Sequence, residues 1–478
     1  MKSTDFPAPP LFEEGISAPE IYRRIGVFLD ALAALPKKSW RPHVDSRGIR
    51  VEGPGLGRMK RLLDLLGDPA AGRSIVHVAG TSGKGSTALM IARSLHAGGR
   101  RTAAFFSPHL TTLAERFWVC GRFLEAEAAG GCAARLAGAA AEMAKDTDLG
   151  PPSYFEATLA LLLLAAEEAD CTEVVLEAGL GGTYDATNAV SPAVLDVITP
   201  VGLDHTDLLG DTVERIARDK AGIITRGGRV ISAADHHGAR AEIGRAARER
   251  GAGLFSPPEV KRLDSGQAGC VFDLGFEDGS CWEELRTPMC GAHQAGNAAL
   301  AAGACRLLGL DEAEIRAGIE AARLPGRIEP MPGGPPVILD GAHNRDKARA
   351  LSGALGAWSA GRRHFVLGTM GDKDYRGLCE ELAAPGDRFH AVLPPGGTPR
   401  PGLPPEKLSE ALIEAGAGSV DVILDPWGAF EGAISEAGEE GLVVVAGSLY
   451  LAGELRRRWI SEEAIIRSGN AFPQEMWT

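Results

Sequence analysis

The sequence predicts an α/β protein with two domains: a larger P-loop-type domain with a mostly parallel sheet flanked by helices, and a smaller, Rossmann-like C-terminal domain. Short apolar, β-branched runs recur along the chain and are typical of strands buried on both faces of a parallel sheet. Segments with helical spacing separate these runs. A stretch rich in proline and glycine at 331–336 breaks the pattern and predicts a linker.

The elements follow in order from these patterns. Strands are expected at 75–78, 102–106, 174–177, 194–199, from 337, and at 364–367, 391–393, 420–424 and 442–446. Helices are expected at 55–67, 85–97, 157–166 and from 291 to about 308. The domains are predicted at 1–325, of which 1–48 form an arm and a helix, and at 326–478.

Composition limits the classes of partner. The 478 residues carry a net charge of −13, which argues against a nucleic-acid surface and against an anionic membrane. The eight cysteines form no C-x-x-C pair, so we expect reduced thiols, no disulfide and no zinc site. The N-terminus has no apolar signal-peptide core, and the longest apolar run, 157–166, is half of a bilayer span. We therefore expect a cytoplasmic enzyme.

A glycine-rich turn, G-T-S-G-K-G-S-T at 80–87, follows the first predicted strand and opens a helix. Its glycines allow the backbone to aim N–H groups inward, so an anion would meet a helix N-terminus. Lys84 would reach the terminal phosphates of a nucleotide, and the hydroxyl of Ser86 or Thr87 would ligate a bridging magnesium ion. The turn favours an ATPase-type domain over a strand, turn and helix without a ligand.

The turn departs from the common P-loop pattern because Gly85 follows the lysine. With that glycine and the preceding His-Val-Ala, it resembles the ATP loop of the Mur ligase superfamily, in the folylpolyglutamate synthase and dihydrofolate synthase branch. That family usually has Asn where Ser82 stands. The resemblance implies ATP and Mg²⁺ as cofactors, with Lys84 also catalytic. It implies nucleotide contacts from Thr81, Gly83, Lys84, Gly85, Ser86 and Thr87.

Two further segments can have a purely structural role or the ligand-binding role that the resemblance implies. Ser107-Pro-His109-Leu is a turn at a strand end, and in the family a similar segment borders the folate site. Ser153-Tyr-Phe-Glu156 has the spacing of a helix capping box, in which Glu156 bonds the Ser153 backbone N–H. The resemblance instead assigns Glu156 to a magnesium ion and assigns Ser107 and His109 to the substrate.

An Asp-His pair, ending at His205, follows another predicted strand at the edge where parallel sheets bind ligands. A lone histidine there is more often a packing residue, but the resemblance assigns His205 to a second magnesium ion beside Ser86 and Glu156. Lys220 is by itself a solvated helix charge. The resemblance makes it a catalytic residue that is modified by carbamoylation.

The glycine-rich turn at 179–188 implies a close backbone approach. Its Asp185 and Asn188, with Glu177 before it, could face a ligand or only brace the turn. The family usually has Arg where Thr183 stands. Further on, Gln294 and Asn297 lie three residues apart at a helix start.

These two amides share one helix face and suit an adenine edge, as the resemblance implies, although a polar first turn would look the same.

The second domain contributes a P-G-R segment, a D-G-A-H-N segment and a final Gly-Ser-Leu-Tyr. The resemblance implies that these act on ATP phosphates, ribose and glutamate. The residues concerned are Arg327, Asp340 and His343, which are also implied in catalysis, and Ser448 and Tyr450, which are assigned to the substrate.

Together these motifs predict an ATP-dependent ligase that activates a carboxylate as an acyl phosphate and joins it to L-glutamate. The acceptor would be dihydropteroate, a reduced folate or both. One alternative is a ligase of this type for another pteridine or cofactor acid, and another is a P-loop switch protein that makes no amide. The expected partners are small molecules, with no nucleic acid and no membrane, and the protein is expected to be a monomer.

Overall fold

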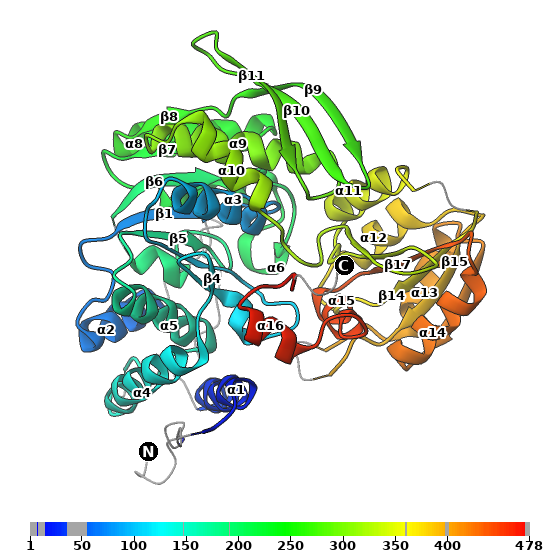
Figure 1. Ribbon diagram of the computed structural model, residues 1–478, viewed down its shortest axis with the longest axis horizontal. Coiled ribbons are helices and arrows are strands. Elements are labelled where there is room, and N and C mark those ends of the chain that lie inside the picture. The colour runs from blue at the N-terminus through cyan, green and yellow to red at the C-terminus, as the bar shows by residue number, and fades with distance from the viewer. Residues whose placement is uncertain are drawn as a thin grey trace. The chain divides into compact units, whose positions relative to one another are not determined.

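The computed structural model describes residues 7, 15–35, 55–146, 148–190, 192–358, 361–396 and 401–473 (Figure 1). The chain forms two compact units, each assembled from several segments. Unit 1 comprises Met1–Pro258, Asn297–Ala321 and Glu462–Asn470, and unit 2 comprises Glu259–Gly296, Ala322–Ser461 and Ala471–Thr478. The domain limits expected at 325/326 stay a prediction. Of the expected arm and helix at 1–48, only residue 7 and 15–35 are described, and 18–34 form a helix.

Unit 1 is built on a sheet that, within the described residues, has eight strands in the order β4-β3-β2-β5-β1-β6-β7-β8. The strands β2, β5, β1, β6, β7 and β8 run parallel, and β3 and β4 form an antiparallel edge. The strands are β1 (Ser74–Ala79), β2 (Thr102–Phe105), β3 (Phe117–Val119), β4 (Arg122–Phe123), β5 (Glu173–Glu177), β6 (Ala193–Ile198), β7 (Arg229–Ser232) and β8 (Gly253–Phe255). Because β1 is central, the loop that follows it lies between the ends of β5 and β6.

Helices complete unit 1 and confirm the predicted α/β class. The α-helices are α1 (Ala18–Ala34), α2 (Gly55–Leu66), α3 (Lys84–Ala97), α4 (Ala126–Met143), α5 (Tyr154–Glu168), α6 (Thr206–Leu209), α7 (Val213–Lys220), α8 (His237–Arg250), α9 (His293–Leu307, which begins in unit 2), α10 (Glu312–Ala321) and α16 (Glu462–Ser468). Short 3-10 helices are η1 (Leu113–Arg116), η2 (Ala186–Ala189) and η3 (Ala221–Ile223). Helix α3 packs on β1, β2 and β5, and α10 packs on α3.

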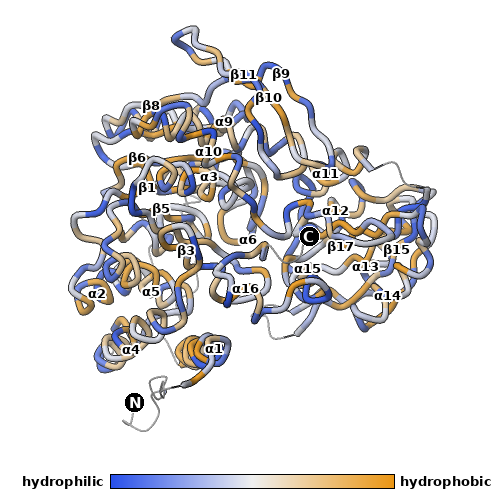
Figure 2. Tube along the Cα trace, in the orientation of Figure 1, coloured by the Kyte–Doolittle hydropathy of each residue, from blue (hydrophilic) through white to orange (hydrophobic). Residues whose placement is uncertain are grey.

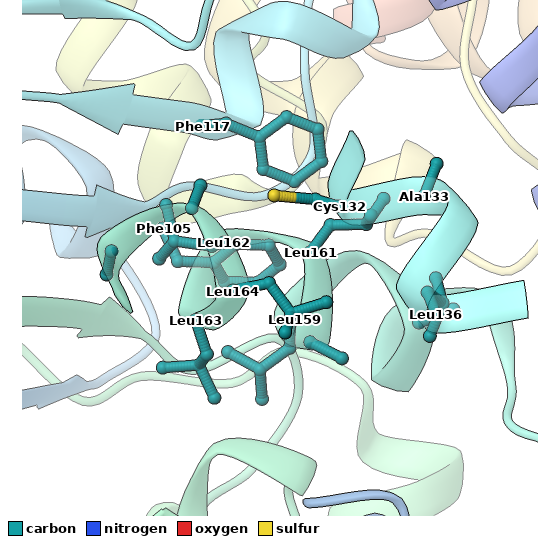
Figure 3. Close-up of a cluster of buried hydrophobic side chains, with 14 of the residues drawn as sticks. Phe105, Phe117, Cys132, Ala133, Leu136, Leu159, Leu161, Leu162, Leu163 and Leu164 are labelled. Carbon is teal, nitrogen blue, oxygen red and sulfur yellow. The ribbon is translucent and has the colours of Figure 1, made fainter. Parts of the chain in front are cut away.

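The apolar run that was too short for a bilayer is the centre of the unit 1 core. Every residue of α5 from Glu156 to Ala166 is buried. Figure 3 shows Leu161 of α5, Cys132 of α4 and Phe117 in one cluster of buried side chains, and all three are at most 2% exposed. Helix α1 adds an amphipathic surface whose apolar positions face this core (Figure 2). No helix in the described part of the chain is long and apolar enough to cross a membrane.

Unit 2 contains a second sheet which, among the described residues, has six strands in the order β12-β13-β17-β14-β15-β16. All are parallel except β12. The strands are β12 (Glu329–Met331), β13 (Val337–Leu339), β14 (Arg363–Leu367), β15 (Arg388–Val392), β16 (Ser419–Ile423) and β17 (Leu442–Ala446). The helices are α11 (Arg345–Leu355), α12 (Tyr375–Leu382), α13 (Pro405–Glu414), α14 (Pro426–Ala437) and α15 (Leu449–Arg456). Strand β12 pairs with β13 up to Met331, which is the first residue of the linker expected at 331–336.

The sequence analysis missed a three-stranded antiparallel sheet in unit 2. It consists of β9 (Glu259–Gly266), β10 (Gly269–Gly275) and β11 (Cys281–Thr287). An Asp278-Gly279 pair between β10 and β11 was a readable hairpin signal. Most of β9 is exposed, so its sequence lacks the apolar alternation that would have marked it as a strand.

Candidate nucleotide and ligation site

The loop after β1 has a backbone that only glycine accommodates. Gly80 and Gly83 have φ values of +155° and +82°. A Cβ atom on Gly83 would lie 2.2 Å from Oδ1 of Asn297, and one on Gly80 would lie 1.7 Å from Oγ1 of Thr199. Helix α3 then begins at Lys84, with its first N–H groups directed out of the helix N-terminus. The expected P-loop shape is therefore present in unit 1.

Two of the predicted lysines meet at one backbone carbonyl. Nζ of Lys84 donates to the Gly80 carbonyl oxygen at 3.2 Å, and Nζ of Lys220 donates to the same oxygen at 2.7 Å. Lys220 ends α7 and is only 4% exposed, so it is not the solvated helix charge that its sequence alone suggested. The fold thus brings together two cations that are 136 residues apart.

The loop is held from the β6 side. The backbone N–H groups of Thr81 and Ser82 donate to the Pro200 carbonyl at 3.0 and 3.4 Å. The Thr81 hydroxyl donates to the Gly202 carbonyl at 3.0 Å. These bonds fix the start of the turn, because both carbonyls belong to the segment that leaves the sheet at the end of β6.

Small hydroxyl side chains line the first turn of α3. Ser86 and Thr87 are 3% and 0% exposed. Within the described residues, Oγ1 of Thr87 and Oγ of Ser82 have no hydrogen-bond partner. Buried hydroxyls without partners are costly in a folded protein, so their oxygens suit a bound polar group. This donor set fits a phosphate and a hard cation, which takes oxygen ligands.

Glu156 makes the contacts of a helix capping box. Its Oε2 accepts from the Ser153 backbone N–H at 2.7 Å, and the Ser153 hydroxyl accepts from the Glu156 N–H at 3.3 Å, which completes the capping box. Arg58 of α2 adds a bidentate pair, with Nε and Nη2 at 2.6 and 2.8 Å from the two carboxylate oxygens. Sequence spacing gave no signal for Arg58, which lies 98 residues from Glu156.

His205 occupies a special backbone position. Its φ is +51°, and it precedes α6 as the N-cap residue. Asp204 accepts from the His205 backbone N–H at 3.0 Å, and its carboxylate lies 3.7 Å from Nε2 of the ring. The His205 side chain is 23% exposed, so an approaching ligand can reach it.

The segment before Lys220 is locked to the turn at 179–188. Asp219 accepts from the Gly182 N–H at 2.9 Å, and its carbonyl accepts from the Thr183 hydroxyl at 2.8 Å. A Cβ atom on Gly182 would lie 2.7 Å from the Lys220 carbonyl oxygen. Thr183 therefore fixes the end of α7 that carries the lysine. The sequence analysis missed Asp219, although its place directly before the lysine was a usable signal.

The other polar residues of this turn brace it. Asp185 is buried and accepts from the backbone N–H groups of Leu180 and Thr187 at 2.8 and 3.0 Å. Burial raises the pKa of Asp185 above its usual range. The Thr187 hydroxyl also lies 2.8 Å from Nε2 of His77, whose pKa burial lowers to about 4. Asn188 donates to the Thr183 carbonyl at 3.0 Å. The bracing alternative thus describes Asp185 and Asn188.

The predicted substrate segment after β2 contains a charged neighbour. Nδ1 of His109 accepts from Nε of Arg116 at 2.9 Å. Burial and the Arg116 charge lower the pKa of His109 to about 3, so the ring is neutral at physiological pH. Arg116 also lies over the Tyr154 ring, 5.4 Å from its centroid. The Ser107 N–H donates to the Glu177 carboxylate at 2.9 Å, which ties this segment to the end of β5.

Gln294 and Asn297 are the second and fifth residues of α9, near the helix start as predicted, and are 1% and 5% exposed. The contact between Asn297 and Gly83 shows that this amide abuts the P-loop backbone. A substitution at Asn297 would therefore change the loop as well as any base contact.

In unit 2, Asp340 and His343 follow the carboxyl end of β13, and Ser448 and Tyr450 follow that of the adjacent β17, whereas Arg327 lies before β12. Asp340 is 7% exposed and accepts from the backbone N–H groups of Ile328 and Ala342 at 2.8 and 2.7 Å. Burial raises its pKa. Arg327 donates to the Gly326 carbonyl at 3.0 Å. Asp340 therefore holds in place the loop that carries Arg327.

The neighbouring polar groups have fixed orientations. Nδ1 of His343 donates to the Gly341 carbonyl at 2.8 Å, which leaves Nε2 as an acceptor 2.9 Å from Nζ of Lys347. Ser448 caps α15, and its hydroxyl oxygen accepts from the Tyr450 N–H at 3.1 Å. Ser448 is 3% exposed, and its bond to the Tyr450 N–H satisfies a buried polar group at the helix start.

A buried ion pair beneath Arg327 was also missed. Glu329 and Arg456 are 3% and 0% exposed at their side chains and lie 2.9 Å apart. Glu329 accepts from the Gly326 N–H at 2.8 Å. Ile328, which directly precedes Glu329 in the chain, has a φ of +48°, which is an outlier for a β-branched residue. The ion pair and Asp340 hold this strained loop.

Comparison with known proteins gives a consistent result. The sequence model of the Mur ligase middle domain matches residues 78–305, and that of the Mur ligase glutamate ligase domain matches residues 326–449. The chain is similar to the dihydrofolate synthase/folylpolyglutamate synthase of Bacillus subtilis, with 33% identity over 416 residues, 85% of this chain and 95% of that protein.

It is also 35% identical over 412 residues to a probable bifunctional folylpolyglutamate synthase/dihydropteroate synthase of Halobacterium salinarum. That match takes in 85% of this chain but only 49% of the archaeal protein, so the chain spans about half of that relative's length. Among solved structures, Mycobacterium tuberculosis folylpolyglutamate synthase complexed with ADP and AMPPCP has a TM-score of 0.81 at 27% identity. The superposition includes 96% of this chain and 100% of that chain.

Proposed function

Because this chain belongs to the folylpolyglutamate synthase/dihydrofolate synthase family of Mur ligases, we propose that it adds L-glutamate to dihydropteroate, to reduced folates, or to both. It is an ATP-dependent ligase that forms a carbon–nitrogen bond between an acid and an amino acid. The acceptor carboxylate attacks the γ-phosphorus of ATP, the bond to ADP breaks, and an acyl phosphate forms. The glutamate amine then attacks the acyl carbon, releases phosphate and loses a proton to give the amide.

The single observation that carries this proposal is the position of Lys84, whose Nζ lies at the Gly80 carbonyl beside the N-terminus of α3. Phosphoryl transfer spreads negative charge over the transferring oxygens, and fixed positive charge stabilises it. Lys84 is held by one long bond to a neutral carbonyl, so a phosphate can compete for it. The N–H groups at the start of α3 add to this positive potential.

The reaction uses ATP together with a divalent metal ion, which when bound screens the phosphate charges. We assign the metal site to Ser86, Glu156 and His205, with His205 holding a second ion. The buried hydroxyls of α3 and the exposed ring edge of His205 suit this role. Glu156 can take part because each carboxylate oxygen has two lone pairs, which leaves capacity beyond the bonds from Arg58 and Ser153.

Lys220 is assigned as a carbamate. A deprotonated lysine amine adds CO₂, with loss of a proton, to give two carboxylate oxygens on a long stem. Few anionic groups are available to a doubly charged cation among the assigned ligands, and magnesium prefers oxygen. The burial of Lys220 and the Asp219 bonds that fix the end of α7 would restrict where such a group points.

The remaining assignments follow the family resemblance residue by residue. Besides Ser86, the nucleotide contacts from the loop are Thr81, Gly83, Lys84, Gly85 and Thr87. Gln294 and Asn297 recognise adenine. Ser107 and His109 contact the acceptor, Arg327 and Asp340 contact the nucleotide, and His343, Ser448 and Tyr450 contact glutamate. We further expect a cytoplasmic monomer.

Release of phosphate tests the proposal. The full chain is assayed with ATP and Mg²⁺ in the presence and absence of L-glutamate, with dihydropteroate, tetrahydrofolate or no acceptor. We expect release only when glutamate and at least one acceptor are both present. Release that is independent of glutamate would favour an ATP switch, and glutamate-dependent release with neither folate compound would indicate another carboxylic acid as acceptor.

A further inference from the structure

Two histidines and a glutamate meet on the sheet of unit 2, apart from the residues discussed so far. His364 lies on β14, His390 lies on the neighbouring β15, and Glu436 lies near the end of α14. The two imidazole rings stack with an interplanar angle of 17° and a centroid separation of 6.2 Å. Both histidines are buried, whereas Glu436 is exposed.

The geometry of the three side chains suits a shared cation. Oε2 of Glu436 lies 3.7 Å from Nδ1 of His364 and 3.9 Å from Nε2 of His390. One ligand atom from each residue lies within 4.8 Å of the other two. A zinc ion bound at about 2.0–2.2 Å from nitrogen and oxygen ligands would need only small side-chain movements to be reached by all three.

The imidazole nitrogens are available for coordination. Among the described residues, Nδ1 of His364 and both ring nitrogens of His390 have no hydrogen-bond partner. A buried polar atom without a partner is unfavourable, and a metal ion would satisfy it. Burial lowers the pKa of both histidines, so the rings are neutral at physiological pH, which is the form that binds metals.

Asp421 of β16 stands on the other side of His390. Its Oδ2 lies 3.9 Å from Nδ1 of His390, opposite the nitrogen that faces Glu436. Histidines that bind metals commonly direct their second ring nitrogen to a carboxylate. Arg388 is the competing cation, with Nε 2.8 Å from Glu436 and Nη2 2.9 Å from Asp421. A metal ion would have to displace this arginine from Glu436.

The position in the sheet separates this cluster from the ligation residues. His364 is the second residue of β14, and His390 is the third of β15. Asp340 and Ser448 instead follow the carboxyl ends of β13 and β17, which run parallel to these strands. The cluster therefore lies toward the amino ends of the strands and joins them to α14, which packs on β14 and β15.

Although the cysteine spacing predicts no zinc site, we propose that His364, His390 and Glu436 bind a divalent transition-metal ion, with Zn²⁺ the best match, and that the ion fastens α14 to the sheet of unit 2. Two imidazoles and one carboxylate suit Zn²⁺ or Co²⁺, whereas Mg²⁺ takes mainly oxygen ligands. The ion stabilises the fold of unit 2 and takes no part in the ligation chemistry.

The test is isothermal titration of Zn²⁺ into the full chain, freed of any affinity tag and stripped with EDTA, alongside thermal unfolding. Glu436→Gln removes a ligand from an exposed position, and Glu439→Gln is the matched control on the turn after α14. We expect Glu436→Gln to weaken binding by about tenfold or more and to reduce the rise in Tm with Zn²⁺. The control should behave as the wild type.

The eight free cysteines are competing ligands for Zn²⁺, so the comparison of variants, and not binding alone, decides. His390→Gln, checked for folding by circular dichroism, should repeat the loss, and the Co²⁺ form should lack the strong thiolate absorption band of a cysteine site. Equal affinity and equal Tm shifts in the wild type and Glu436→Gln, or no Zn²⁺ binding by the wild type, would overturn the proposal.

Discussion

Cations are held in two different ways in the two units. In unit 1, Lys84 and Lys220 donate to one neutral carbonyl, that of Gly80. In unit 2, Arg456 is paired with the carboxylate of Glu329, and neither side chain is more than 3% exposed. A cation hydrogen-bonded to a backbone dipole can be attracted by an incoming phosphate, whereas a cation locked to a buried carboxylate stiffens the surrounding chain. Substitutions in the two regions should therefore affect different measurements.

The largest effect is expected at the ion pair of unit 2. Glu329→Gln leaves Arg456 as a buried charge without its carboxylate and weakens the bond to the Gly326 N–H. Removal of one partner of a buried pair costs about 3–5 kcal/mol. Denaturant unfolding of the variant should show that loss of stability. An unchanged unfolding midpoint would mean that the pair does not hold this loop.

Lys220→Ala should lose much less stability than Glu329→Gln. It should lose nearly all turnover, a fall of about 10³-fold if the carbamate supplies a metal ligand and its charge. Added formate or acetate should restore part of the activity, because a small carboxylate can replace the lost oxygens. Full activity in Lys220→Arg would exclude the carbamate as a requirement, since guanidinium cannot form one under these conditions.

Lys84→Ala should lower turnover by roughly 10², the effect of removing one electrostatic group that acts on the transition state. Lys407→Ala, on the exposed surface of α13, is the matched control and should leave turnover unchanged. Steady-state rates at saturating ATP make the comparison. Turnover near the wild-type value in Lys84→Ala would remove this lysine from the phosphoryl transfer step.

The smallest effect is expected from the two amides of α9. Replacement of Gln294 and Asn297 by Ala should raise the KM for ATP about tenfold, as the loss of two hydrogen bonds implies. Because Asn297 also abuts the P-loop, Gln294→Ala alone is the variant in which turnover should change much less than the KM. Selectivity for ATP over GTP should fall in parallel. If both nucleotides are used as before, these residues only begin the helix.

The sequence identified the backbone of the site better than the partners of its charges. Gly80 and Gly83 were readable because close approach and positive φ leave only glycine. The ends of β1 and β6 were readable because runs of apolar residues stop there. Arg58 was missed as the partner of Glu156, because ion pairs between distant segments depend on packing that no local spacing encodes.

The same contrast explains the rest of the fold. Strand β17 was placed correctly at 442–446, because all five residues are buried and apolar. Strand β9 was missed, because it is mostly exposed and its pairing with β10 is decided by tertiary structure. The capping box at Ser153 was predicted from spacing alone and is present, since capping is local.

The central claim is that the phosphate leaves ATP by way of the acceptor carboxylate. The most direct measurement uses an acceptor whose reacting carboxylate carries ¹⁸O, turned over with ATP and L-glutamate, followed by mass analysis of the released phosphate. An acyl phosphate intermediate transfers one ¹⁸O atom from each carboxylate to the phosphate, and we expect that label in stoichiometric amount with amide product. Unlabelled phosphate would show that water attacked ATP and would contradict the ligase mechanism.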